Sequence, residues 1–213
     1  MIKKFLSLFL ATSMLAFAAA APAQAAPAQT ADAVVKKGTE DLLALIRTNH
    51  EKYAQDLDAF YKTVDETVVP YFDTKGIAQL VLGRNWKTAN EDQRKRFENA
   101  FKNSLIRTYA RAMLDYYDSV NAEWQPVRAE AGATDVTVNA KLNRTNNAPP
   151  IPLAFSMHVV DGAWKIYDIS VENLSLATNF RSQVNVEIKA NGLDATIQKF
   201  ENNAVLQKPE TKG

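Results

Sequence analysis

The chain contains no cysteine, which excludes disulfides, thiolate metal sites and a lipid-modified cysteine. It has two histidines, His50 and His158, and neither has a second metal ligand at a suitable spacing. His158 falls on the polar phase of its strand, so a solvated or locally hydrogen-bonded side chain is the better interpretation. The sequence therefore predicts no metal site and no cofactor, and a fold that its core alone stabilises.

The chain also lacks an excess of charge of either sign. Its formal net charge is +1, and it becomes −1 if Lys3 and Lys4 are removed with the N-terminal segment. Domains that bind nucleic acids are usually strongly basic, which this balance does not indicate. We therefore expect no nucleic-acid partner.

Long apolar runs are missing except at the N-terminus. Lys3 and Lys4 precede the apolar stretch Phe5 to Ala20, and Ala23-Gln24-Ala25 forms a small-x-small cleavage site. This pattern predicts a secretory signal peptide over residues 1–25, cleaved near Ala25, and export to the periplasm. An uncleaved membrane anchor is the alternative, since no charged residue follows Lys4 until residue 32.

The rest of the chain predicts one domain and a short tail. Residues 26–206 are long enough to bury a substantial core without disulfides, and they show no internal repeat. The polar segment 207–213 predicts a frayed tail. We expect the protein to be a monomer.

The first part of this domain has helical periodicity. Apolar residues recur at helical spacing from Asp32 to about Asn49, and again from Leu57 to Val68 behind the capping residue Asp56. Pro70 ends the second helix. A short third helix is expected between its cap, Asp73, and Gly83, whose left-handed conformation would end it.

A long helix follows, for which Thr88-x-x-Glu91 or Asn90-x-x-Gln93 predicts a capping box. Its inner stripe is expected to comprise Phe97, Phe101, Leu105, Tyr109, Met113 and Tyr116. Its outer face is basic, through Arg94, Lys95, Arg96, Lys102, Arg107 and Arg111. We interpret this face as the solvated side of an amphipathic helix, with a docking surface as the alternative.

From Val120 the apolar period changes to two. The expected strands lie around Trp124 and Val127, from Val136 to Leu142, from Ile151 to Val159 and from Trp164 to Val171. Asp161-Gly162 predicts a tight hairpin turn before the last strand. Helical spacing returns from Ser175 to Lys189, and a last short helix follows Asn191-Gly192. Helices followed by antiparallel strands predict an α+β fold in which helices pack on the sheet.

Large apolar residues concentrate in the stretches Val68 to Tyr109 and Trp164 to Gln183, which contain no assembled catalytic set. Such residues are more often plain core than the wall of a pocket. Export, the lack of catalytic groups and the short helices around Pro70 and Gly83 favour a pocket. The residues expected to line it are Val68, Tyr71, Phe72, Ile77, Leu80, Val81, Trp86, Phe97, Phe101, Leu105, Tyr109, Phe155, Met157, Trp164, Ile166, Leu176 and Phe180.

Three polar residues beside apolar ones are candidates for a function. Arg84 and Arg181 could meet a phosphate at the mouth of the pocket. Asp168 interrupts the strand IYDISV beside aromatic residues, where a carboxylate can act as a general base. The alternative, which we favour, is a strand-edge or bulge aspartate that bonds backbone amides. The residues therefore favour a binding protein over an enzyme.

Four groups of segments, taken together, resemble the toluene-tolerance family, the soluble periplasmic phospholipid carriers of the Mla pathway that maintains outer-membrane lipid asymmetry. The segments are VVPYFD at Val68 to Asp73, LVLGRNWKTA at Leu80 to Ala89 followed by QRKRFENAF at Gln93 to Phe101, WKIYDISVENLSL at Trp164 to Leu176 with NFRSQ at Asn179 to Gln183, and NGLDATI at Asn191 to Ile197. Their order and spacing make the resemblance specific. The sequence Arg84-Asn85-Trp86 departs from the less polar or tyrosine-bearing sequences of some relatives, which affects the expected head-group preference.

The resemblance implies a nuclear-transport-factor-2-like cone, in which helices cap a strongly curved antiparallel sheet. Both acyl chains of a phospholipid would lie in its hydrophobic pocket, with the head group near the mouth. It also implies no catalytic residues, transient proximity to membranes, and two partners: an outer-membrane lipoprotein–porin complex and an inner-membrane ABC transporter complex. We therefore expect a phospholipid shuttle. A cone-fold enzyme that uses Asp168 as a base on a hydrophobic substrate and a periplasmic chaperone remain the alternatives.

Overall fold

The computed structural model describes residues 29–130, 132–145 and 148–202. The predicted signal peptide, residues 1–25, and the predicted tail, residues 207–213, lie outside them. The helices are α1 (Ala31–Gln55), α2 (Leu57–Thr67), the 3-10 helix η1 (Val69–Tyr71), α3 (Thr74–Leu82), α4 (Asn85–Thr88), α5 (Glu91–Tyr116), α6 (Leu176–Asn191) and α7 (Leu193–Glu201). The strands are β1 (Val120–Trp124), β2 (Asp135–Arg144), β3 (Ile151–Val160), β4 (Ala163–Val171) and β5 (Leu174–Ser175).

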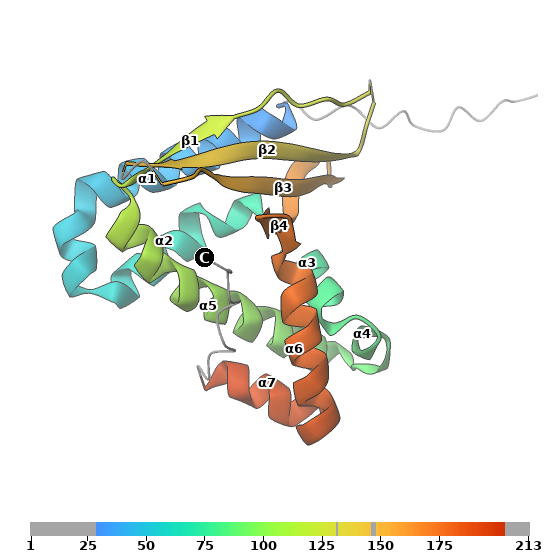
Figure 1. Cartoon of the computed structure of the whole chain (residues 1–213). Coiled ribbons are helices and arrows are strands. Elements are labelled where there is room, and N and C mark those ends of the chain that lie inside the picture. Colours follow the sequence, from blue (N-terminus) through green and yellow to red (C-terminus); the bar gives the residue numbers. More distant parts are fainter. Residues whose placement is uncertain (1–28, 131, 146–147, 203–213) are drawn as a thin grey trace, which may run out of the picture.

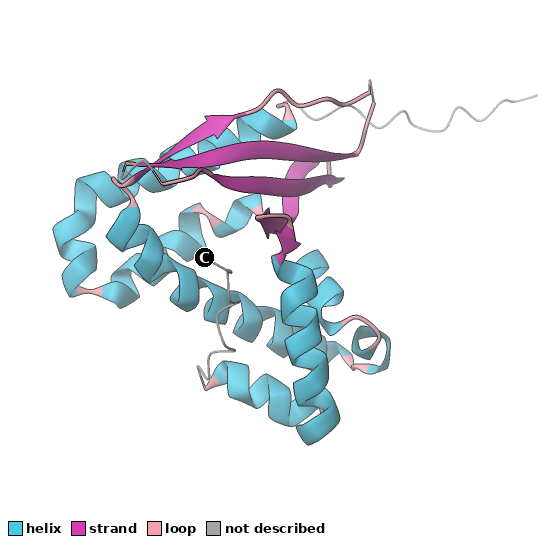
Figure 2. Ribbon diagram, viewed as in Figure 1, coloured by secondary structure: helices cyan, strands magenta, loops and turns pink. Residues whose placement is uncertain are grey.

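The strands form one layer, and most of the helices lie beneath it (Figure 2). Figure 1 shows α1 behind the sheet. In the same view, α5, α6 and α7 lie below the sheet. No helix within the described ranges combines the length and the apolar character that a membrane crossing requires. The predicted α+β architecture, with helices packed on an antiparallel sheet, is confirmed.

Short polar side chains start the helices where the sequence predicts. Asp56 and Asp73 each accept a hydrogen bond from the backbone amide three residues later, at 2.9 and 2.8 Å. Asn90 and Gln93 form a capping box, because Asn90 Oδ1 accepts from the Gln93 amide at 2.8 Å and Gln93 Oε1 accepts from the Asn90 amide at 3.0 Å. These bonds satisfy backbone donors that have no partner within the first turn of a helix.

The first helix is longer than predicted, because the helix continues beyond Asn49 to Gln55. At Asn49 the backbone is not helical (φ −125°, ψ 19°), and its side chain donates to the Leu45 carbonyl at 3.1 Å. This local bond competes with regular helix geometry. The chain therefore kinks at Asn49 and then resumes the helix. The short α4 was not predicted, because four residues are too few to show a period.

The inner stripe of α5 is wrong at its last residue, Tyr116, which is 62% exposed. Met113 is 41% exposed but still faces a cavity described below, whereas Ala110 and Leu114 are buried against α1 and α2. At 3.6 residues per turn, each step of four residues rotates about 40° beyond a full turn. A stripe that follows four-residue steps therefore moves off the buried face of a long helix.

The five strands pair antiparallel in sequence order, β1-β2-β3-β4-β5. Between β3 and β4 the register shifts: Ser156 opposes Asp168, but Met157 opposes Ile166. Tyr167, which lies between Ile166 and Asp168 on β4, therefore has no partner across the ladder. Such a bulge bends the strand and increases its twist, which gives this sheet local curvature.

The predicted hairpin between β3 and β4 is confirmed. Asp161 and Gly162 have positive φ angles of 49° and 77°, as a type I′ turn requires. The first strand lies slightly earlier than predicted and ends at Trp124. The helix after the sheet begins at Leu176, behind the capping residue Ser175, whose hydroxyl accepts from the Thr178 amide at 3.0 Å.

Three apolar clusters hold the layers together. One joins α1 to a sheet face that includes Val138 and Met157. A second joins α3, α5, α6 and α7, where Phe97, Phe101 and Phe200 have ring centroids within 5.6 Å of one another. The third joins α1, α2 and α5. Full burial of a side chain as large as phenylalanine stabilises the fold by roughly 1.5–3 kcal/mol.

Candidate functional site

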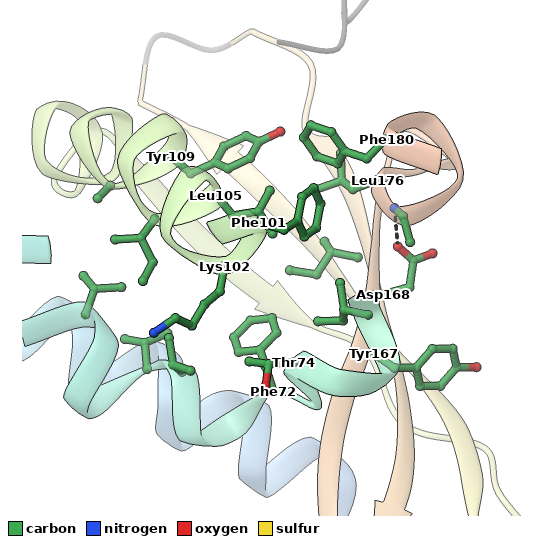
Figure 3. A pocket seen from close by; sticks show the side chains of 18 of the residues that line it. Phe72, Thr74, Phe101, Lys102, Leu105, Tyr109, Tyr167, Asp168, Leu176 and Phe180 are labelled. Atoms are coloured by element: carbon green, nitrogen blue, oxygen red, sulfur yellow. Dashed lines mark hydrogen bonds between the residues drawn. The ribbon is translucent and has the colours of Figure 1, made fainter. Parts of the chain in front are cut away.

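A cavity of about 300 Å³ lies where the helical layer meets β4. Its walls come from α5 on one side, α6 on the opposite side, and α3 with the α2–η1 segment (Figure 3). Ligand pockets have volumes of roughly 300–1,000 Å³, so this cavity is at the lower end of the range. Its lining is almost entirely apolar, and the predicted hydrophobic pocket is therefore present in the fold.

About half of the side chains expected to line a pocket do line this cavity. From α5, Phe101, Leu105 and Tyr109 project toward Leu176 and Phe180 on α6 (Figure 3). The expected residues in the lining are Val68, Phe72, Ile77, Phe101, Leu105, Tyr109, Leu176 and Phe180. Their contact with a lipid stays a prediction.

Four expected residues, from α3, α4 and α5, lie outside the cavity lining. Val81 and Phe97 are fully buried in the cluster beneath α6 and α7, where protein side chains surround them on all sides. Leu80 points outward and is 39% exposed. Trp86 packs against the same cluster, and the Arg94 guanidinium lies over its ring at 5.3 Å from the centroid.

Five expected residues lie instead in the cluster that joins α1 to the sheet. They are Tyr71, Phe155, Met157, Trp164 and Ile166. Successive residues of a strand point to opposite faces, so a two-residue period does not tell which face adjoins a cavity and which adjoins α1. The Tyr71 hydroxyl donates to Asp41 at 2.8 Å, on the α1 side.

The two arginines expected at the mouth also lie outside the lining. Arg84 and Arg181 are both exposed. Arg181 packs on the turn after α3, where a Cβ at Gly83 would lie 2.7 Å from its Nε atom. Gly83 has a φ of +55°, a backbone conformation that favours glycine, whereas the flexible end of the Arg181 side chain could move away from a Cβ. Arg181 joins α6 to the α3–α4 turn.

Sequence reasoning missed part of the lining. The apolar residues that were not expected there are Val64, Val69, Ile106, Ala110, Met113, Ile169, Val171 and Ala177. Met113 was placed on the inner stripe of α5, and that stripe was the signal that could have identified it. The unexpected polar residues are Thr74, Glu98, Lys102, Tyr167 and Asp168.

Two polar pairs form one edge of the cavity. Thr74 Oγ1 donates to Glu98 Oε1 at 2.6 Å, which joins α3 to α5. One turn further along α5, Lys102 Nζ donates to Asp65 Oδ1 at 2.5 Å, which joins α5 to α2. Lys102 was expected on the outer basic face of the long helix, and that placement is wrong. Its side chain is only 20% exposed because it lies between α2 and the cavity.

Asp168 contacts backbone rather than another acid or base. Its Oδ1 atom accepts from the Ala177 amide in the first turn of α6 at 3.0 Å (Figure 3). Asp168 lies next to the β4 bulge. The favoured interpretation of Asp168, a bulge aspartate that bonds a backbone amide, is confirmed. A carboxylate at a helix N-terminus stabilises the helix through the macrodipole.

Tyr109 differs from the other polar residues of the lining. Its hydroxyl is buried and has no hydrogen-bond partner among the described residues. Burial raises the pKa of the Tyr109 phenol above its usual range, so the hydroxyl stays protonated at physiological pH. It is therefore an unsatisfied donor in the wall of the cavity.

The basic face of α5 is largely paired with acidic side chains. Lys95 pairs with Glu91 at 3.0 Å, Arg96 with Glu201 at 2.8 Å, and Arg111 with an acidic residue one turn later at 3.0 Å. A hydrogen bond and the charge of Lys95 lower the pKa of Glu91, and the Arg96 guanidinium lowers that of Glu201 in the same way. This arrangement agrees with the interpretation of a solvated face.

The isolated histidine of β3 was expected to be solvated or locally hydrogen-bonded, but its partner lies 85 residues away in the chain. His158 Nε2 lies 2.9 Å from Asp73 Oδ2, the carboxylate that caps α3. Within residues 29–130, 132–145 and 148–202, no three side chains of the types that bind metals come together as a possible metal site.

The chain is similar to several known proteins. A family model described as the MlaC protein matches residues 36–202. The toluene tolerance protein ttg2D of Pseudomonas putida is 29% identical over 191 residues, which cover 88% of this chain and 87% of the relative. The intermembrane phospholipid transport system binding protein MlaC of Haemophilus influenzae is 25% identical over 175 residues, or 80% of each chain.

A solved structure has the same fold. It is that of the phospholipid-binding protein from Ralstonia solanacearum in complex with a phospholipid. The match has a TM-score of 0.74 with 32% sequence identity, and it covers 82% of this chain and 97% of that protein.

Proposed function

Because the chain belongs to the MlaC protein family, as its resemblance to the toluene-tolerance proteins predicted, we propose that it is a carrier that binds a phospholipid in the cavity between α5 and α6. The observation that carries this proposal is the apolar lining of that cavity, in a fold whose solved relative holds a phospholipid. The acyl part of the ligand contacts Phe101, Leu105 and Phe180.

The physical need for such a cavity follows from the hydrophobic effect. Transfer of one methylene group out of water is favourable by about 0.8 kcal/mol, so a phospholipid with about thirty methylenes does not cross an aqueous compartment unaided. An apolar cavity replaces the membrane interior during the transfer. Release requires only that a membrane or a partner offers a comparable apolar site.

The head group of the ligand lies at the polar edge of the cavity. Thr74, Glu98 and Lys102 hold this edge, and among the described residues Lys102 is the one cationic residue in the lining. A phosphate that approaches this edge can exchange with Asp65 as the partner of Lys102. This position replaces Arg84 and Arg181 as the proposed head-group contact.

We further infer that the carrier operates in the periplasm, between a lipoprotein–porin complex of the outer membrane and an ABC transporter complex of the inner membrane. The predicted signal peptide and the intermembrane transport named for the Haemophilus relative support this location. The chain then acts without a metal, a nucleotide or a covalent step of its own, and it transfers intact phospholipid to maintain lipid asymmetry.

The composition of the bound material tests the carrier function. Protein purified from the periplasm after expression of the full chain is extracted with organic solvent, and the extract is analysed by mass spectrometry. We expect intact diacyl phospholipid in near-stoichiometric amount. Lysophospholipid or free fatty acid that accumulates with protein concentration would support an enzyme, and bound polypeptide without lipid would support a chaperone. Either result contradicts the proposed function.

A further inference from the structure

Every polar side chain that lines the cavity has a partner within the described residues, with one exception. The paired groups are Thr74 with Glu98, Lys102 with Asp65, Tyr167 with Asp135, and Asp168 with the Ala177 amide. The exception is Tyr109, whose hydroxyl is buried and has no protein partner in those residues. Four paired groups in the same cavity show that the fold satisfies its polar atoms where it supplies both partners.

A buried hydroxyl without a partner destabilises the folded protein, because the group loses its hydrogen bonds to water. Phenylalanine would fill the same space without that penalty. Tyr109 lies on the α5 side of the cavity, next to Leu105 and across from the ring of Phe180 on α6 (Figure 3). Its hydroxyl stays protonated, because burial raises the pKa of the phenol. The wall of the cavity therefore contains a hydrogen-bond donor that no described residue satisfies.

The surroundings of Tyr109 determine which acceptor it fits. Leu105, Met113 and Phe180 give this part of the cavity an apolar lining, in which a charged phosphate would lose its hydration without compensation. Lys102, seven residues earlier on the same helix, lies about 10 Å away along the axis and suits the charged group better. A neutral carbonyl oxygen next to a hydrocarbon chain satisfies both conditions.

We propose that the Tyr109 hydroxyl donates a hydrogen bond to an ester carbonyl oxygen of the bound lipid, and that the protein thereby selects ester-linked over ether-linked chains. This inference rests on the proposed phospholipid carrier function and specifies its ligand. An ether-linked chain has the same apolar length but lacks the carbonyl, so it leaves the hydroxyl without its acceptor.

The test compares two lipids on three proteins. Delipidated wild type, Tyr109→Phe and Tyr53→Phe are titrated with phosphatidylethanolamines of equal chain length, one with ester-linked and one with ether-linked chains, in competition with a fluorescent lipid. Tyr53 is the matched control, because it is buried and its hydroxyl already donates to Thr63 at 3.2 Å, away from the cavity.

We expect wild type to prefer the ester lipid by about three- to tenfold, which corresponds to one neutral hydrogen bond. Tyr109→Phe should bind both lipids equally, and Tyr53→Phe should keep the wild-type preference. Thermal unfolding of the delipidated proteins gives a second readout: Tyr109→Phe should be at least as stable as wild type, whereas Tyr53→Phe should be less stable.

Two results would overturn the inference while the carrier function stands: equal binding of both lipids by wild type, or an unchanged preference in Tyr109→Phe. A delipidated Tyr109→Phe that unfolds at a lower temperature than wild type would also overturn it, because the hydroxyl would then have a partner within the protein. If wild type binds neither lipid, the proposed carrier function itself fails.

Discussion

Leu105 and Val81 are both apolar residues of helices, but they face different surroundings. Val81 is fully buried among α3, α5 and α6, and protein atoms surround it. Leu105 faces the cavity, where a new side chain has room and contact with the ligand. A charge at Val81 would therefore unfold the protein, since an unpaired buried charge costs several kcal/mol. The same charge at Leu105 acts mainly on the ligand.

We predict that Leu105→Asp folds but retains less than a tenth of the wild-type phospholipid. A carboxylate at this position is incompatible with an acyl chain in contact with it. Lipid per protein is measured by phosphate analysis after extraction, and circular dichroism checks the fold.

The matched control for this variant is Val186→Asp. Val186 is 69% exposed on α6, so the same substitution there introduces the charge into water. We expect Val186→Asp to retain wild-type lipid content. Normal lipid content in a folded Leu105→Asp would remove Leu105 from the binding site.

At the scale of the elements, the start of α6 connects the sheet to the cavity. Ser175 and Asp168 each bond an amide of the first turn, and this turn carries the lining residues Leu176 and Ala177. Asp168 lies next to the β4 bulge and reaches the helix from there. A strand, a bulge and a helix cap together therefore determine the position of one wall.

We predict that Asp168→Ala lowers the free energy of unfolding by about 1–2 kcal/mol, because one amide of α6 loses its acceptor. Asp168→Asn keeps an oxygen at that place and loses only the favourable charge at the helix N-terminus, so it should cost about 0.3–1 kcal/mol. Both values are measured by urea denaturation.

The chemical identity of the bound lipid should be the same in Asp168→Ala, Asp168→Asn and wild type. If Asp168→Asn were as stable as wild type but abolished a turnover of phospholipid that wild type shows, Asp168 would be a general base and the enzyme alternative would be correct.

At the scale of the whole molecule, the carrier has to reach its compartment and then meet its partners. We predict that the chain recovered from the periplasm begins near Ala26, because the small residues Ala23 and Ala25 suit a signal peptidase. N-terminal analysis of material released by osmotic shock measures this. Ala25→Leu should retain the N-terminal segment and stay with the inner membrane. Retention of Met1 in the released wild type would contradict the prediction.

Surface charge should affect lipid transfer without affecting lipid binding. Lys95 and Arg107 lie exposed on α5, away from the cavity, whereas Lys102 belongs to the cavity edge and is unsuitable for this purpose. We predict that the variant with Lys95→Glu and Arg107→Glu exchanges lipid more slowly with the membrane complexes, most strongly at low salt, because such charges steer encounters.

The bound lipid per protein should not change in this double variant. A control with Lys62→Glu and Lys189→Glu, on α2 and α6, makes the same number of charge reversals at other exposed positions. If both variants and wild type transfer lipid at equal rates at all salt concentrations, the basic face of α5 is only a solvated surface.

The sequence by itself determined the features that depend on near neighbours in the chain. Asp56, Asp73 and Asn90 start helices because their side chains reach amides three residues away, and Asp161-Gly162 turns because both residues adopt positive φ. The change from helical to two-residue periodicity likewise predicted the α+β class. The spaced segments from Val68 to Ile197 predicted the family.

Only the tertiary structure decided which apolar residues surround a cavity. Phe97 and Phe101 lie one turn apart on α5, yet only Phe101 borders the cavity, whereas Phe97 is fully buried and packs edge-on against Phe200 of α7. Lys102 and Asp168 joined the lining because α2 and the first turn of α6 supplied their partners from distant parts of the chain. Periodicity shows which face of an element is apolar. What lies opposite that face depends on how the elements pack.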